Sequence, residues 1–154
     1  MLNELYTFAE PVQVVPFSNL KWGKFTLLHT TDDTRWTTSD KAKSIYDPCP
    51  AGWRVPDGGS NGVWSKTRFD DTTYDSTNKG ISFRISSPAT TWYPASGYRG
   101  GNGSLSHGGK DGNYWSASPS KSNAYGLCFY GNGDVDPSYS YARSGGRSVR
   151  CVKE

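Results

Sequence analysis

The last third of the chain, from Tyr93 to Glu154, alternates two kinds of sequence. Short apolar pieces, such as Asn113–Ser118, Leu127–Phe129 and Ser148–Val152, are separated by runs of Gly, Ser, Asn, Tyr and Asp. The apolar pieces are typical of strands, whereas the polar runs lack the apolar periodicity that a core requires. Tyr combined with Ser, Gly and Asn is also the composition of an antibody paratope. The pattern therefore predicts a rigid scaffold that displays a binding face.

The length of 154 residues suits one domain, with residues 1–20 as an N-terminal arm or linker strand and residues 21–154 as the domain. Hydrophobic residues make up 34% of the chain, but 6 Trp, 10 Tyr and 6 Phe are too many for a disordered protein. We therefore expect a core of aromatic rings. The net charge of +3 comes from scattered basic residues, which argues against nucleic-acid binding.

No stretch approaches the roughly 20 apolar residues that a membrane span needs, so we expect no membrane insertion. The first residues contain neither the basic nor the apolar region of a secretory signal. Either the protein is not exported by that route, or its signal and anchor have been removed.

Local patterns predict one clear helix and several strands. Thr38–Tyr46 has a Ser or Thr cap, an acidic first turn and an apolar face, and Asp47-Pro48 ends it. Strands are expected at Lys24–His29 and at Gly80–Ile85, where alternation with period two places the apolar side chains inward. Val12–Phe17 lies between prolines, which confine it to an edge strand or an extended arm.

Ala124–Tyr130 carries the most informative alternation in the chain. Tyr125, Leu127 and Phe129 share one face and are expected in the core. The other face, which holds Gly126, Cys128 and Tyr130, is then expected to point outward or toward a ligand.

The aromatic residues fall into two groups by context. Tyr130, Tyr139 and Tyr141 lie in polar stretches without aliphatic neighbours, so we expect them to be exposed contact residues. Five tryptophans lie beside fixed-looking motifs and are expected in the core: Trp22, Trp36, Trp53, Trp92 and Trp115.

Four ordered motifs carry a family resemblance: Tyr46–Pro56 (YDPCPAGWRVP), Tyr114–Ser118 (YWSAS), Ala124–Phe129 (AYxLxF) and Arg143–Val152 (RxxGxSVRCV). With these motifs, residues 20–154 resemble the C-type-lectin-like domains of Bacteroidetes surface proteins of the Fibrobacter major paralogous type. More narrowly, the chain resembles the variable proteins of diversity-generating retroelements, which include phage receptor-binding tips and pilus-tip adhesins.

The resemblance implies that adenine-directed mutagenesis rewrites exposed positions in the last third of the chain, over about residues 98–147. Residues there belong to the set that such mutagenesis produces. The expected ligand-binding residues are Tyr98, Ser106, His107, Lys110, Asp111, Asn113, Gly126, Cys128, Tyr130, Asn132, Asp134, Asp136, Tyr139, Tyr141 and Arg147.

Three cysteines, Cys49, Cys128 and Cys151, allow at most one intrachain bridge. The resemblance implies a disulfide between Cys49 and Cys151, which would tie the first helix region to the last strand. Under the same resemblance Cys128 is a by-product of diversification. The alternative is three reduced thiols, as in a cytosolic protein.

Oxygen ligands on Asn132, Asp134 and Asp136 would suit calcium. However, the Glu-Pro-Asn and Trp-Asn-Asp ligand sets of sugar-binding lectins are absent, and Gly and Asp at a loop tip more often form turns. We therefore expect no metal site and no cofactor, with a calcium-dependent lectin-like adhesin as the alternative.

No catalytic site is expected. His107 and His29 are the only histidines, and no spacing pairs either with Cys128. The acidic pairs Asp32-Asp33 and Asp70-Asp71 are interpreted as solvated surface residues. Some proteins with a related fold, such as formylglycine-generating enzymes, are catalytic, but a shared fold does not imply a shared function.

Together, these observations predict an α+β protein with a C-type lectin-like fold: mostly antiparallel strands, one or two helices and long loops. The expected function is that of an adhesin or receptor-binding protein at a cell surface or on a virion, binding a protein or glycan on another cell or surface. Assembly into an oligomer, pilus or phage tail would add avidity. The remaining alternative is a structural tip domain that only docks neighbouring subunits.

Overall fold

The computed structural model describes residues 33, 35–66, 72–84 and 89–154. The chain separates into two compact units, Met1–Thr31 and Asp32–Glu154, and every described residue belongs to the second. The predicted arm at residues 12–17, the predicted strand at residues 24–29, the acidic pair at residues 70–71, Asp32, His29 and Trp22 lie outside the described residues.

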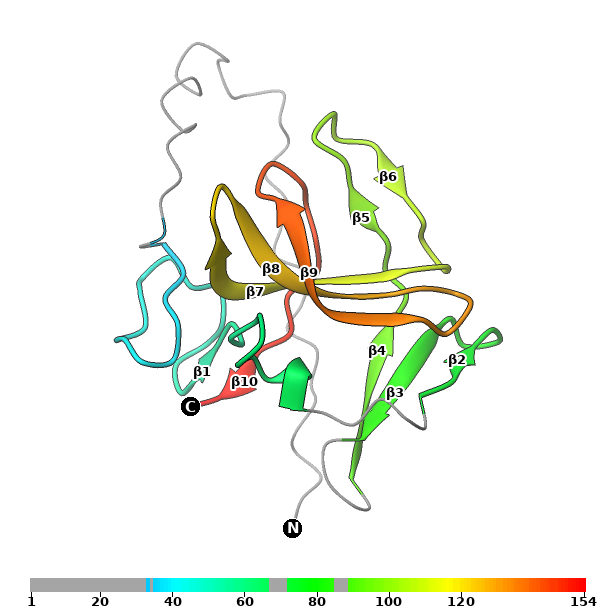
Figure 1. The fold of residues 1–154 in the computed structure, drawn as a ribbon, viewed down its shortest axis with the longest axis horizontal. Coiled ribbons are helices and arrows are strands. Elements are labelled where there is room, and N and C mark those ends of the chain that lie inside the picture. The colour runs from blue at the N-terminus through cyan, green and yellow to red at the C-terminus, as the bar shows by residue number, and fades with distance from the viewer. Residues whose placement is uncertain (1–32, 34, 67–71, 85–88) are drawn as a thin grey trace. The chain divides into compact units, whose positions relative to one another are not determined.

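Ten strands and one 3-10 turn make up the regular structure of the described residues (Figure 1). They are β1 (Trp53–Arg54), η3 (Trp64–Lys66), β2 (Tyr74–Asp75), β3 (Gly80–Arg84), β4 (Thr90–Pro94), β5 (Tyr98–Arg99), β6 (Leu105–Ser106), β7 (Gly112–Ser120), β8 (Asn123–Phe129), β9 (Val135–Ala142) and β10 (Val152–Lys153). Antiparallel pairing joins β7, β8 and β9 in that order, and likewise β2, β3 and β4. Two shorter ribbons are β5–β6 and β1–β10, the second of which brings the end of the chain to residues 53–54.

The predicted fold class is wrong. Over the described residues helical conformation is confined to η3, and no α-helix forms. The α+β class with one or two helices is therefore corrected to a β-rich fold.

The predicted helix at residues 38–46 consists of turns and bends instead. Two side chains from outside the segment account for this. The guanidinium of Arg54 donates to the carbonyl oxygens of Thr37 and Thr38, each at 2.8 Å, and Asp57 accepts the backbone N–H of Ser39 at 2.9 Å. These contacts hold the backbone groups in a loop, so tertiary interactions override the local helix signals.

The main core lies between the β2–β3–β4 and β7–β8–β9 sheets and is aromatic, as composition predicts. Ile81 and Phe83 of β3 are buried, which confirms the alternation expected there. Leu127 and Phe129 of β8 are also buried, as predicted, whereas Tyr125 is only partly buried. The buried members of this cluster are Trp64, Ile81, Phe83, Tyr93, Ala95, Tyr114, Leu127 and Phe129.

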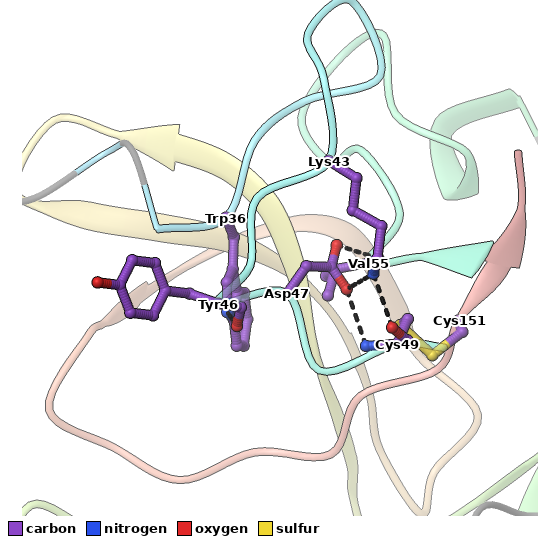
Figure 2. The surroundings of a disulfide bond; sticks show 7 residues. All are labelled: Trp36, Lys43, Tyr46, Asp47, Cys49, Val55 and Cys151. Carbon is purple, nitrogen blue, oxygen red and sulfur yellow. Dashed lines mark hydrogen bonds and ion pairs between the residues drawn. A yellow bond between two sulfur atoms is a disulfide. The ribbon is translucent and has the colours of Figure 1, made fainter. Parts of the chain in front are cut away.

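A second buried corner surrounds the disulfide between Cys49 and Cys151, the pair that the family resemblance implies (Figure 2). The carboxylate of Asp47 accepts the backbone N–H groups of Cys49 at 2.8 Å and Val55 at 3.1 Å. Lys43 Nζ donates to the same carboxylate at 2.7 Å. The loop at residues 47–55 is thus joined covalently to Cys151, the residue before β10, and organised by one buried acid.

Candidate ligand-binding face

The register of the β7–β8–β9 sheet gathers many of the predicted site residues on one face. Asn113 of β7 pairs with Cys128 of β8, which pairs with Asp136 of β9. One step along, Gly126 of β8 pairs with Tyr139 of β9. Paired residues share a face, and alternation places these five opposite the side chains that form the main core. Trp115 and Tyr141 lie on the same face, since Trp115 pairs with Gly126 and Tyr141 with Ala124.

The segment at residues 146–148 extends this face beyond β7. Ser148 accepts the N–H of Trp115 at 2.9 Å and donates its own N–H to the carbonyl oxygen of Asn113 at 3.1 Å. On its other side, Gly146 exchanges two backbone hydrogen bonds with Arg99 of β5. The segment therefore connects the β5–β6 ribbon to β7 and carries Arg147 between them.

The guanidinium of Arg147 lies against three aromatic rings of the face. Its central carbon is 4.1 Å from the ring centre of Tyr141, 4.9 Å from that of Trp115 and 5.3 Å from that of Tyr98. A Cβ on Gly145 would overlap Arg147 Nη1, so a larger residue there would displace the guanidinium from its present position. Burial lowers the pKa of Arg147 from its ordinary value. The face thus contains a cation that is held by rings (cation–π contacts).

A buried polar group lies beside these rings. The hydroxyl of Tyr141 is 2.8 Å from Asn113 Oδ1 and 3.2 Å from the carbonyl oxygen of Leu127. The thiol of Cys128 is 3.7 Å from the same Asn113 oxygen. Burial raises the pKa values of both Tyr141 and Cys128. The pKa of Tyr130 is also raised, chiefly by its hydrogen bond with Cys128. At neutral pH these groups are therefore uncharged hydrogen-bonding partners.

At the rim of the face, the ring of Tyr98 lies 5.5 Å from that of His107. The imidazole Nδ1 of His107 contacts the carboxylate of Asp111, which is nearly buried, while the His107 side chain is 54% exposed. Ser106 pairs with Tyr98 across the β5–β6 ribbon. Lys110 is exposed in the turn between the β5–β6 ribbon and β7.

Asn132 and Asp134 do not join the face. They lie at the exposed turn between β8 and β9, where the Asn132 amide donates to the Asp134 carboxylate at 2.7 Å and Asn132 Oδ1 accepts the Asp134 N–H at 3.1 Å. Asp136, on β9, accepts the backbone N–H of Ser138 at 2.9 Å. These oxygen atoms therefore bond within the turn and strand, and among the described residues no three His, Cys, Asp or Glu side chains gather as a metal site requires.

The expected exposure of the site residues needs correction. Tyr141 and Cys128 are buried at 6% and 3% exposure, and Gly126 is also buried, although Tyr141 was predicted to be exposed and Gly126 and Cys128 to point outward or toward a ligand. The side of the strand was right, but Trp115, Tyr141 and Cys128 pack there as a small cluster of their own, with Trp36 and Val149 against it. Two further predicted contact residues, Asp111 and Asn113, are buried as well. Tyr139 remains 40% exposed, and Tyr130 is half-buried.

Trp115 belongs to this candidate face, although sequence reasoning did not include it among the expected ligand-binding residues. It was assigned to the core with the other tryptophans, and it is 7% exposed. However, it lies on the same side of β7 as Asn113, where its ring contacts the Arg147 guanidinium and packs edge-to-face with Tyr141 at 5.5 Å. Its spacing of two from Asn113 was the available signal, because residues two apart share a face of a strand.

We call this surface the Arg147 face and define it by Tyr98, His107, Asn113, Trp115, Cys128, Tyr139, Tyr141 and Arg147. Rigid rings offer contact area at low entropic cost, and a guanidinium offers directional donors. The arrangement is suited to binding.

Within the described part of the chain, no helix has the length and apolarity to span a bilayer. Comparison of the chain with protein-family models, with curated proteins and with solved structures found no match.

Proposed function

We propose that this protein binds ligands through the Arg147 face, as an adhesin or receptor-binding protein, and that a diversity-generating retroelement varies that face. The observation that carries the proposal is spatial. Many of the positions that the family resemblance assigns to ligand binding, though not Asn132 and Asp134, lie on one side of β7, β8, β9 and the flanking segments. These include Tyr98 and Arg147, which strand alternation in β8 did not select.

The architecture supports a separation between scaffold and binding surface. The main core packs on the opposite side of β7 and β8, through Tyr114, Leu127 and Phe129. Substitutions at exposed positions on the other side of these strands do not touch that core, and such positions usually change stability by less than about 0.5 kcal/mol. Tyr139 and Lys110 are exposed and can change at little cost to folding, and His107 is exposed as well, although it contacts the nearly buried carboxylate of Asp111.

The disulfide between Cys49 and Cys151 supports placement outside the cell, because disulfides persist in oxidising compartments. We propose a location at a cell surface or on a virion, with a protein or glycan on another surface as the partner. A single face of this size suits modest affinity, which multiple copies on a pilus or tail would amplify.

The test is to sequence the encoding locus across a population of the source organism. We expect substitutions at adenine-containing codons of exposed face positions such as Tyr139, His107 and Lys110, together with a near-repeat of the coding segment beside a reverse transcriptase gene. Core positions such as Leu127 and Phe129 provide the internal control and should be constant. Variation that is uniform along the chain, or equal at core and face codons, would refute the retroelement proposal.

A matched display experiment tests binding directly. One library randomises Tyr139, His107 and Lys110, and a control library randomises three exposed positions away from the face, Lys41, Ala42 and Ser60. Selection against a panel of surface proteins and glycans should yield binders from the first library only. Equal yields from the two libraries would mean that the Arg147 face has no special binding capacity.

A further inference from the structure

The guanidinium of Arg147 has no anionic partner in the described structure. Among the described residues no carboxylate lies within 4.0 Å of it, and its Nε and Nη1 atoms are buried without a hydrogen-bond partner. A desolvated cation gains cation–π energy from rings, but ring faces are weak acceptors for its N–H groups. An anionic group placed beside Arg147 would therefore compensate its charge and accept hydrogen bonds from its N–H groups.

Nearby acids are already engaged with other partners. Asp111 contacts His107, Asp134 is bonded to the amide of Asn132, and Asp136 accepts the N–H of Ser138. Within the part of the chain that the structure describes, no carboxylate therefore pairs with Arg147.

A second unpartnered donor lies in the same cluster. Asn113 is 3% exposed, its Oδ1 is taken by Tyr141, and its Nδ2 is buried without a hydrogen-bond partner. Buried polar groups are normally satisfied, and exceptions call for an absent water, ion or ligand group. Two unsatisfied donor side chains in one cluster of a proposed binding face are consistent with a ligand that accepts hydrogen bonds.

Arg147 as a whole is half-buried, so part of the residue reaches solvent. The adjacent ring of Tyr139 is 40% exposed and lies 4.6 Å from that of Tyr141, so a ligand that reaches Arg147 also meets an aromatic surface.

We propose that Arg147 anchors a carboxylate of the ligand, so that the Arg147 face recognises acidic ligands. Guanidinium and carboxylate match in geometry, and their hydrogen bonds are charge-assisted. A sugar acid and an acidic amino-acid side chain present the same group, and the neighbouring Tyr139 ring contacts the rest of either. This inference rests on the proposed binding role of the face.

The test is an NMR titration of the full chain with two pairs of probes. Methyl glucuronide is compared with methyl glucoside, and N-acetyl-aspartate amide with N-acetyl-asparagine amide. We expect saturable shifts of the Arg147 side-chain N–H signal with the acids, at concentrations up to tens of millimolar, and none with the neutral partners. Binding of the sugar acid alone, or of the aspartate alone, supports the anchor and identifies the source of the carboxylate.

Arg147→Gln removes the charge and should weaken acid binding by about 10-fold or more, since a hydrogen bond to a charged group contributes about 1.5–3 kcal/mol. Arg147→Lys keeps the charge without the planar fork and should retain intermediate affinity. Arg99→Gln is the matched control, because Arg99 neighbours Tyr98 on β5 and alternation directs it to the other side. It should bind like the unmodified protein. Melting temperatures of all variants separate lost binding from lost folding.

The proposal is wrong if neither acid gives a saturable shift, if the neutral probes bind as well as the acids, or if Arg147→Gln binds acids as tightly as the unmodified protein. Should Arg147→Gln fail to fold, the side-chain signal of the unmodified protein and the Arg147→Lys titration still decide the matter. Failure of the proposed function itself would be read separately, from the distribution of substitutions in the encoding locus.

Discussion

The carboxylate of Asp47 is the most sensitive polar group in the corner beside the disulfide (Figure 2). Its side chain is 0% exposed, and its two oxygens accept the backbone N–H groups of Cys49 and Val55 and the ammonium of Lys43. Cys49 and Val55 are themselves buried, so water cannot replace the acid as their acceptor. We therefore predict a large loss of stability when the carboxylate is removed.

The structure sets the size of the loss. In Asp47→Ala two buried N–H groups lose their acceptor, at about 1–3 kcal/mol each, so the free energy of unfolding should fall by about 2–6 kcal/mol. Asp47→Asn keeps the shape and one acceptor oxygen, but its amide NH₂ would face one of the N–H donors. We expect that variant to lose about 2 kcal/mol, since one donor is left unsatisfied.

Urea unfolding, followed by far-ultraviolet circular dichroism at neutral pH, measures these changes as shifts of the midpoint at constant slope. Lys43→Met is the first control. It removes a donor that is 21% exposed and that also bonds the carbonyl oxygen of Cys49, but it leaves both backbone bonds to Asp47, so it should cost about 1–2 kcal/mol, less than Asp47→Ala. Asp40→Ala, at an exposed acid, should stay within about 0.5 kcal/mol. The reasoning is refuted if Asp47→Ala costs no more than either control.

Three further outcomes are expected. Replacing both Cys49 and Cys151 by Ala opens a loop with a sequence separation of 102, and should lower the free energy of unfolding by up to about 4.7 kcal/mol; a change below about 1 kcal/mol in urea unfolding would contradict the entropic account. Burial raises the pKa of the Cys128 thiol, so iodoacetamide at mildly alkaline pH should label it only after denaturation, as mass spectrometry would detect; rapid labelling of the native protein would show that the site opens. A Cβ on Gly126 would overlap backbone of β7, so Gly126→Ala should cost about 1–3 kcal/mol in thermal unfolding, whereas Gly108→Ala, which meets open space, should cost much less; equal effects would argue against the tight packing.

Part of the fold was predictable because some signals in the chain are local and periodic. The alternation in β3 and β8 identified Ile81, Phe83, Leu127 and Phe129 as core, since a half-buried strand shows its inner face with period two. The disulfide could not be derived from spacing, because three cysteines allow several pairings, and it came from the family resemblance alone.

The helix expected at residues 38–46 shows where local reasoning fails. Capping residues, an acidic first turn and an apolar face were all present in the sequence. What decides the conformation is Arg54 and Asp57, which bind the carbonyl and amide groups of Thr37–Ser39 from 16 to 18 residues away. Propensity is worth less than about 1 kcal/mol per residue, so a few charge-assisted hydrogen bonds outweigh it.

The candidate site shows a different limit. Alternation correctly separated Gly126 and Cys128 from the main core, but it cannot say whether the other side of a strand meets solvent. That side is covered because Trp115 and Tyr141 are large enough to pack against one another there and Arg147 lies across them. The alternation of side chains along a strand shows which residues share a side of the sheet. Whether that side is exposed depends on the volume of the side chains that pack on it.

This division has a consequence for how the face can vary. Asn113, Cys128 and Tyr141 form one hydrogen-bonded, buried group, so changing one member leaves a partner unsatisfied. Tyr139 reaches solvent and carries no such constraint, whereas His107, although exposed, is the partner of the nearly buried Asp111 carboxylate. If the face is diversified, surviving sequences should therefore vary freely at the exposed positions, while changes at the buried three should occur together. In such a surface, the buried residues would be conserved because folding depends on them, and substitutions at the exposed residues would change which ligand is bound.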